Sequence, residues 1–209
     1  IDRLSTYQQT NGGFSYWPGS GLKADSWGTS YAGHFLLEAQ SRGYQVSREM
    51  LRQLQVYQTR EANDWRPSRR NYHTDMEQAY RLYTLALAKQ PAMSAMNLMR
   101  ETADTDPVAR WQLAAAYSIA GKTEIAVQII HSLAVKPEAQ NNYDESYGSI
   151  NRDQALIAES MILAGKADQA SALTQDIAAV LSSDEWLSTQ STAVMLRALA
   201  AYSEQRKSA

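Results

Sequence analysis

The sequence predicts an all-α protein, built as an array of antiparallel helix hairpins. Apolar residues recur at three-to-four spacing along most of the chain, while the alternation typical of strands is almost absent. A similar segment, AGKTE at 120–124 and AGKAD at 164–168, recurs after 44 positions, each time between two amphipathic stretches. A single hairpin cannot bury its own apolar face, so this repeat favours a stacked or ring-like arrangement.

The helices follow from the apolar faces. The first face is formed by Trp27, Tyr31, Phe35, Leu36 and Ala39. Comparable faces lie within 76–87, 108–119, 125–133, 152–164, 166–181 and about 187–203. We expect these segments, at residues 1–209, to form one domain, because 209 residues with 44% hydrophobic content can bury one sizeable core.

Helix ends are signalled by specific residues. Asp106 before Pro107 is a helix N-cap followed by a proline in the first turn, where its missing N–H does no harm. Gly43, Gly121 and Gly165 each follow a helical run. We expect each glycine to adopt the left-handed conformation that closes a helix.

Composition excludes several function classes. Twenty Lys and Arg against 22 Asp and Glu give a net charge of −2, which argues against binding nucleic acid or an anionic membrane surface. No apolar run is long enough to insert into a membrane. The absence of cysteine excludes disulfides, thiolate metal sites and cysteine nucleophiles. Because the chain begins at Ile1, we expect it to be a mature or excised piece of a longer protein.

Neither a metal site nor a cofactor is indicated. The three histidines are far apart and form no metal-binding spacing, so we predict no metal and no cofactor. We expect His34 and His131 to be partly buried structural residues. His73 is expected just before a helix, with a general base as the alternative to a capping role.

Acidic pairs leave an enzyme alternative open. Asp75 with Glu77, and Asp184 with Glu185, could imitate the paired carboxylates of a glycosidase, although capping and dipole effects explain acids at helix starts equally well. No nucleophilic serine or phosphate-binding glycine motif is present. The segment 111–126 also approximates a tetratricopeptide pattern, but without a 34-residue period.

Two blocks carry a resemblance to a known family. QQTNGGFSYWP at 8–18, followed by SWGTSYA at 26–32, resembles the glutamine–glycine–aromatic motif of the thioester domain in the alpha-2-macroglobulin family, especially its bacterial members. WLSTQSTA at 186–193 resembles the closing signature of the same domain. The resemblance implies an α/α toroid of the terpenoid cyclase and thioester-domain type, an array that can be incomplete.

The chain departs from the family at its reactive group. Relatives form a thioester within a C-x-E-Q motif that lies upstream of the first block, and this chain has neither the motif nor any cysteine. We therefore expect a fragment of the domain without thioester chemistry. Some relatives use a histidine in the middle of the domain, but the residues around His73 match poorly and the role is not transferred.

The resembling residues are expected to be structural. We predict that the glycine–aromatic loop plugs one end of the barrel and that Trp17, Trp27, Trp111 and Trp186 are mostly buried. The Gln190 side chain is expected to bond free backbone groups at a helix start. The complete set of predicted structural residues is Gly12, Gly13, Phe14, Tyr16, Trp17, Trp27, Trp186, Thr189 and Gln190.

By resemblance, the function expected is that of a structural, non-enzymatic domain in a protein that traps proteases. Its partners would be other domains of the parent protein and the target proteases, and its location periplasmic, cell-surface or extracellular. Two alternatives remain open: a helical scaffold that binds peptide or protein in a groove, and a carbohydrate-active toroid enzyme.

Overall fold

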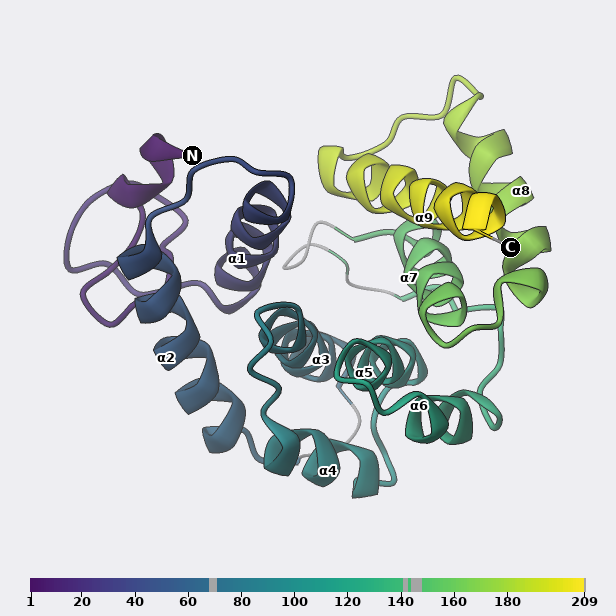
Figure 1. Cartoon of the computed structure of the whole chain (residues 1–209), viewed down its shortest axis with the longest axis horizontal. Coiled ribbons are helices and arrows are strands. Elements are labelled where there is room, and N and C mark those ends of the chain that lie inside the picture. The colour runs from purple at the N-terminus through teal and green to yellow at the C-terminus, as the bar shows by residue number, and fades with distance from the viewer. Residues whose placement is uncertain (68–70, 141–142, 144–147, 209) are drawn as a thin grey trace.

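The computed structural model describes residues 1–67, 71–140, 143 and 148–208 (Figure 1). Within these residues the chain forms nine α-helices and no strand, and one isolated bridge joins Gln8 to Phe14. The prediction of an all-α fold is confirmed. The helices are α1 Ser26–Ser41, α2 Arg48–Asp64, α3 Tyr72–Leu87, α4 Met93–Glu101, α5 Pro107–Ile119, α6 Thr123–Ile130, α7 Ile150–Leu163, α8 Ser171–Leu181 and α9 Thr189–Ser208.

The helices form two layers of a ring. Consecutive odd-numbered helices contact each other in the order α1, α3, α5, α7, α9, and they make up the inner layer. The even-numbered helices α2, α4, α6 and α8 lie outside them, as Figure 1 shows. On the remaining side of the ring, α1 and α9 face each other. This arrangement is the toroid-like array that the sequence predicts.

Four inner helices end in the same turn. A residue with positive φ follows each helix, and the next backbone N–H bonds to a carbonyl five residues earlier, at 2.8 to 3.0 Å. The positive-φ residues are Gly43, Lys89, Gly121 and Gly165, with φ of 85°, 58°, 73° and 73°. The three glycines behave as predicted. The turn after α3 was not predicted, because a lysine and not a glycine occupies its left-handed position.

The inner helices all begin at one end of the ring. Side chains from their first turns contact each other there: Tyr72 of α3 bonds Asp153 of α7 at 2.8 Å, and Ser149 before α7 bonds Ser191 of α9 at 2.9 Å. Asp106 caps α5 by accepting from the Val108 N–H, as the sequence predicts. Its own backbone N–H donates to Asp75 of α3 at 2.9 Å.

The centre of the core is α5, which packs against α3, α6 and α7. Ala114, Ala115 and Ala116 are fully buried, and small side chains let neighbouring helices approach closely. Trp111 is 2% exposed and Trp27 is 5% exposed, which confirms their predicted burial. A second, smaller core joins Phe14 to α1 and α2.

Lys89 provides a test of the repeated turn. Lys89→Gly should raise the free energy of unfolding by about 0.5 to 1 kcal/mol, because glycine adopts positive φ without the Cβ clash. Gly121→Ala should lower it by about 1 kcal/mol; the added Cβ would meet open space, so the loss would come from the backbone alone. Urea unfolding of both variants measures the two changes in the free energy of unfolding. A destabilised Lys89→Gly chain would contradict the left-handed conformation of Lys89.

Candidate functional site

An ion pair joins the inner helices α7 and α9 in the interior of the ring. Arg197 of α9 donates from Nε to Oε1 of Glu159 at 2.8 Å and from Nη2 to Oε2 at 2.6 Å, so the pair is bidentate. The Glu159 side chain is 7% exposed and that of Arg197 is 24% exposed. Tyr83 of α3 donates its hydroxyl to the same carboxylate at 3.1 Å. Helices α3, α7 and α9 therefore share one buried charge centre.

His34 of α1 completes this centre. Its Nδ1 lies 3.1 Å from Nη1 of Arg197 and 3.1 Å from the Tyr80 hydroxyl. Guanidinium nitrogens only donate, so a neutral Nδ1 must accept the bond from Arg197. The imidazole also packs edge-on against the rings of Tyr80 and Tyr83. We call His34, Tyr80, Tyr83, Glu159 and Arg197 the Arg197 cluster.

Burial and charge set the protonation states in the Arg197 cluster. Burial, together with the nearby Arg197 guanidinium, holds the pKa of His34 well below its ordinary value. Burial raises the pKa of Tyr83, and the Glu159 carboxylate raises it further. Burial alone would lower the pKa of Arg197, but Glu159 and the tyrosines more than offset this, so it is raised. At neutral pH, His34 and the tyrosines are therefore uncharged around one ion pair.

A second buried network lies at the end of the ring where the inner helices begin. Arg152 and Asp153 of α7 are 1% and 0% exposed and form an ion pair at 3.2 Å. Arg152 donates to the Tyr72 hydroxyl and lies 4.8 Å over the Trp27 ring, a cation–π arrangement. Tyr143 also bonds Asp153 and packs edge-on against Tyr72.

Burial is also the main influence on the pKa values in this second network. Burial raises the pKa of Asp153, while Arg152 and the Tyr72 hydroxyl act in the opposite direction. Burial also raises the pKa of Tyr72, and raises that of Tyr143 to about 12. Tyr143 belongs to the polar segment 138–149, and its contacts with Asp153 and Tyr72 hold this part of the segment against the inner helices.

The facing surfaces of α1 and α9 form what we call the seam. Two side-chain bridges cross it: the His34–Arg197 contact and a 2.9 Å bond from the Trp27 indole N–H to Oε1 of Gln190. A cleft of about 160 Å³ lies at the His34–Arg197 contact, and its lining also includes Tyr31, Phe35 and Ala193. Phe35 of α1 and Leu196 of α9 are apolar but remain 51% and 54% exposed.

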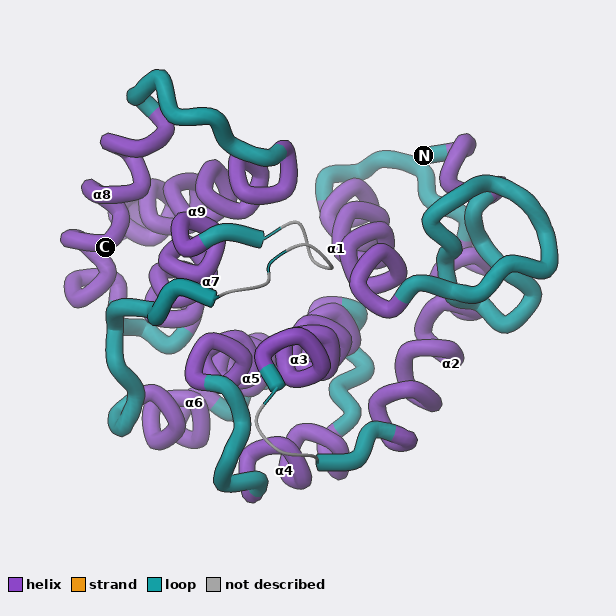
Figure 2. Tube along the Cα trace, turned by 180° about the vertical axis from the view of Figure 1, so that it is seen from behind, coloured by secondary structure: helices purple, strands orange, loops and turns teal. Residues whose placement is uncertain are grey.

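The glycine–aromatic loop does not plug the ring. Figure 2 shows it outside α1 and α2, at the periphery of the molecule. A Cβ on Gly12 would clash with the carbonyl of Gln53 in α2, and one on Gly13 would lie 2.6 Å from the Ala24 Cβ, so both glycines permit close packing. Phe14 is 2% exposed and fills the small core between α1 and α2.

The expected burial of the other loop aromatics is wrong. Tyr16 is 54% exposed and Trp17 is 70% exposed, with their rings packed edge to face. The loop turns back through Gln9, whose buried amide donates to the Gly19 carbonyl at 2.7 Å and accepts from the Leu22 N–H at 3.0 Å. These bonds hold residues 15–22 together and leave the two rings outside.

The closing block is only partly as expected. Trp186 is 85% exposed, so its predicted burial is wrong: it precedes α9 in an exposed connection. Thr189 begins α9 and is exposed, while Ser188 accepts from the Ser191 N–H as the cap. The Gln190 side chain was expected to bond backbone groups at a helix start; instead its Oε1 accepts from the Trp27 indole N–H across the seam.

The three histidines and the acids suggested as catalytic have structural surroundings. His34 is buried as expected, whereas His131 is exposed at the end of α6, against expectation. His73 lies within α3 and not before it, and it pairs with Glu77 at 3.4 Å. Of the acids suggested as catalytic, Asp75 accepts from the Asp106 N–H and Glu185 from Asn151 at 3.1 Å.

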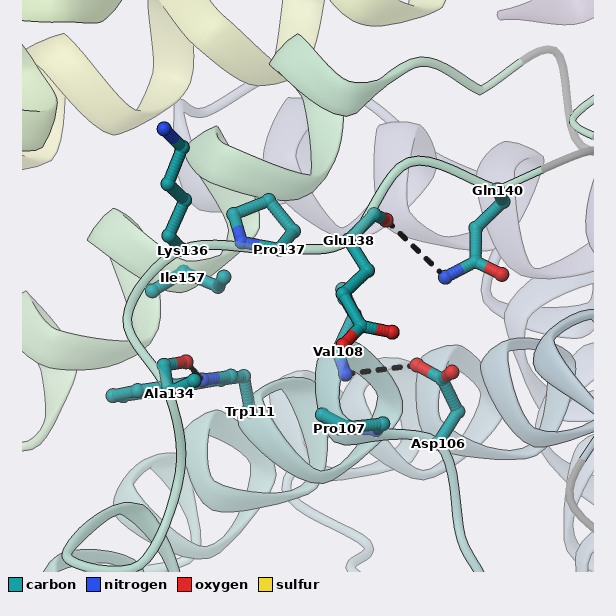
Figure 3. Close-up of a pocket in the computed structure, with 10 residues that line it drawn as sticks. All are labelled: Asp106, Pro107, Val108, Trp111, Ala134, Lys136, Pro137, Glu138, Gln140 and Ile157. Carbon is teal, nitrogen blue, oxygen red and sulfur yellow. Dashed lines mark hydrogen bonds between the residues drawn. The ribbon is translucent and has the colours of Figure 1, made fainter.

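A small pocket lies between the start of α5 and the segment 134–140 (Figure 3). It encloses about 60 Å³, well below the roughly 300–1,000 Å³ of typical small-molecule sites. The carboxylates of Asp106 and Glu138 line it, but Asp106 is already used to cap α5. The Trp111 indole N–H is also used, because it donates to the Ala134 carbonyl. The pocket therefore gives no support to a carbohydrate site.

Two further searches cover only the part of the chain that the structure describes. In that part, no three His, Cys, Asp or Glu side chains gather as a metal site would require. None of its helices combines the length and apolar character needed to cross a membrane.

The fold matches part of bacterial alpha-2-macroglobulin. No family model matches the chain, and no curated protein matches it in sequence. E. coli alpha-2-macroglobulin, solved from domain MG7 to the C-terminus, matches with a TM-score of 0.80 and 24% identity, over 96% of this chain and 33% of that chain. The native conformation of the E. coli protein matches at 0.79 and 23% identity, over 95% and 13%.

A third match is to Salmonella alpha-2-macroglobulin that has reacted with methylamine, with a TM-score of 0.75 and 24% identity, over 95% of this chain and 14% of that chain. The chain thus spans at most a third of the length of these structures. At this level of identity, the matches establish a common helical fold.

The glycine–aromatic loop yields a matched pair of variants. Phe14→Ala should lower the free energy of unfolding by about 3 to 5 kcal/mol, because it empties a buried site. Trp17→Ala should change it by no more than about 0.5 kcal/mol, because the ring is largely in solvent. Denaturant melts of the two variants measure the difference; similar losses in both would contradict the exposure of Trp17.

Proposed function

We propose that this chain is a thioester-type helical domain of a protease-trapping protein related to bacterial alpha-2-macroglobulin. The observation that carries the proposal is the match of almost the whole chain to one part of those proteins. A second support is the contact between the two resembling blocks, because Trp27 of the first bonds Gln190 of the second across the seam. Residues far apart in the sequence thus meet at one position of the ring.

The proposal includes a domain assignment. Residues 1–209 would belong to one toroid domain, downstream of the C-x-E-Q motif of the family, and the open cleft at the seam is compatible with further chain packing there. The chain would contact other domains of its parent, because the matched proteins are at least three times longer than the matched part. The parent would act in the periplasm or at the cell surface.

The role proposed for this chain is mechanical and not catalytic. Without cysteine it cannot form a thioester, so its task would be to provide a rigid body that moves with its neighbours when a protease cleaves the parent. The buried networks around Glu159 and Asp153 support rigidity, because fully bonded polar networks hold packed helices in one arrangement. Of the predicted structural residues, those that are packed or bonded within this body would serve it: Gly12, Gly13, Phe14, Trp27 and Gln190.

The second candidate function is a scaffold for peptide or protein. It is favoured by a groove along α1 lined by Phe35 and Tyr44, which are 51% and 65% exposed, and by the outward rings of Tyr16 and Trp17. Exposed aromatic side chains are common at protein interfaces. The same exposure is expected of an isolated domain whose neighbours would cover these rings, so the parent protein distinguishes the two functions.

The test is made on the parent protein with trypsin and with porcine elastase, which are the activators of E. coli alpha-2-macroglobulin in two solved structures. We expect limited cleavage to change the compactness of the parent in small-angle X-ray scattering, with the protease retained in the same size-exclusion peak. The isolated chain should neither change nor retain protease, because it lacks the other domains.

Two results would count against the proposal. A parent that is cut to fragments without retaining protease would contradict the trapping function. Acrylamide quenching supplies the control on the surface aromatics: Trp17 and Trp186 should be more protected in the parent than in the isolated chain, and the variants Trp17→Phe and Trp186→Phe identify their signals. Equal exposure in both, together with binding of a peptide, would favour the scaffold.

A further inference from the structure

The seam between α1 and α9 is joined differently from the other contacts in the ring. Each other pair of neighbouring inner helices packs through extensive helix-to-helix contact, whereas α1 and α9 are bridged by side chains. One bridge is the neutral bond from Trp27 to Gln190. The other is the contact of His34 with Arg197, in which a titratable ring accepts from a permanent cation at 3.1 Å.

The surroundings of His34 favour its neutral form. Arg197 of α9 faces Nδ1, and the hydroxyls of Tyr80 and Tyr83 approach from α3. Glu159 of α7 accepts from two of the three guanidinium nitrogens of Arg197, Nε and Nη2, and from the Tyr83 hydroxyl. On its own helix, Glu38 lies 4.0 Å from Nε2, but it is 39% exposed and screened by water. Proton uptake would set two cations against each other.

We propose that His34 and Arg197 form an acid-sensitive latch: the seam is closed while His34 is neutral and opens when His34 takes up a proton. Arg197 keeps its bidentate bond to Glu159, so the α7–α9 side of the ring remains intact. His34 stays on α1 and gains access to water as the two helices separate. The latch requires only the contacts among α1, α3, α7 and α9, and it does not rest on the proposed function.

The direction of the pH effect follows from proton binding. His34 has a lower pKa in the closed ring than its value of 6.5 in water, so the open form binds the proton more tightly. The closed form is fully favoured above about pH 6.5. As the pH falls from there toward the pKa of the closed form, the ratio of open to closed ring should rise by about tenfold per pH unit.

The absence of cysteine allows a direct distance measurement. Phe35 on α1 and Leu196 on α9 are both about half exposed, so the double variant Phe35→Cys/Leu196→Cys carries the only two thiols and accepts nitroxide labels. Double electron–electron resonance should show one short distance at about pH 8. At about pH 5, a population at longer distance should appear, and it should revert when the pH is raised.

Two further substitutions identify the group responsible. His34→Gln supplies an amide oxygen that can accept from Arg197 without titrating, so the short distance should persist at low pH. His131→Gln, at an exposed histidine on the outer layer, should leave the pH response unchanged. A labelled chain whose distance does not change down to about pH 5 would overturn the latch, as would an unchanged response in the His34→Gln chain.

A direct titration covers the case in which His34→Gln does not fold. The imidazole Cε1–H signal of His34 in the unsubstituted chain can be followed by NMR against pH. The latch predicts that the signal of the closed ring titrates below 6.5 and that α1 amides lose hydrogen-exchange protection in the same pH range. Titration of His34 at or above 6.5 would overturn the proposal.

Discussion

The buried bond between Glu159 and Arg197 is the constraint on which the interior of the ring depends. A carboxylate that is 7% exposed is unfavourable unless it is paired and hydrogen-bonded, and here it receives two guanidinium N–H groups and a tyrosine hydroxyl. These donors come from α9 and α3, while the carboxylate belongs to α7. The position of each helix is therefore fixed relative to the others, and the imidazole of His34 extends the same network to α1.

The ring has different kinds of contact around its circumference. Near α5, small buried side chains such as Ala114 allow helices to pack closely, and the contact is apolar. At the seam, polar side chains bridge α1 and α9 around a cleft. The peripheral loop is different again, because Gln9 holds its backbone while Trp17 points to solvent. The closely packed helices near α5, the side-chain-bridged seam and the exposed loop thus lie in separate parts of the fold.

The sequence predicts all five inner helices and the outer helices α6 and α8, because the signals for them are local, but it misses the outer helices α2 and α4. The cap at Asp106, the three left-handed glycines and the apolar periodicity of α1, α3 and α5 involve neighbouring residues only. The predicted burial of Trp17 and Trp186 was wrong, because loops lack a periodicity that distinguishes inward from outward positions. The Arg197 cluster was missed, since it joins residues up to 163 positions apart. Its available signal was the presence of Glu159 and Arg197 within otherwise apolar helical segments.

The most direct test of this account is a double-mutant cycle on Glu159→Gln and Arg197→Gln. Each single substitution leaves a buried group without its charged partner and should lower the free energy of unfolding by about 2 to 4 kcal/mol, reduced somewhat by the partial exposure of Arg197. The account predicts that the double variant loses about 2 kcal/mol less than the sum of the two single losses. If the two losses add to within about 0.5 kcal/mol, the ion pair does not hold the ring together and the account is contradicted.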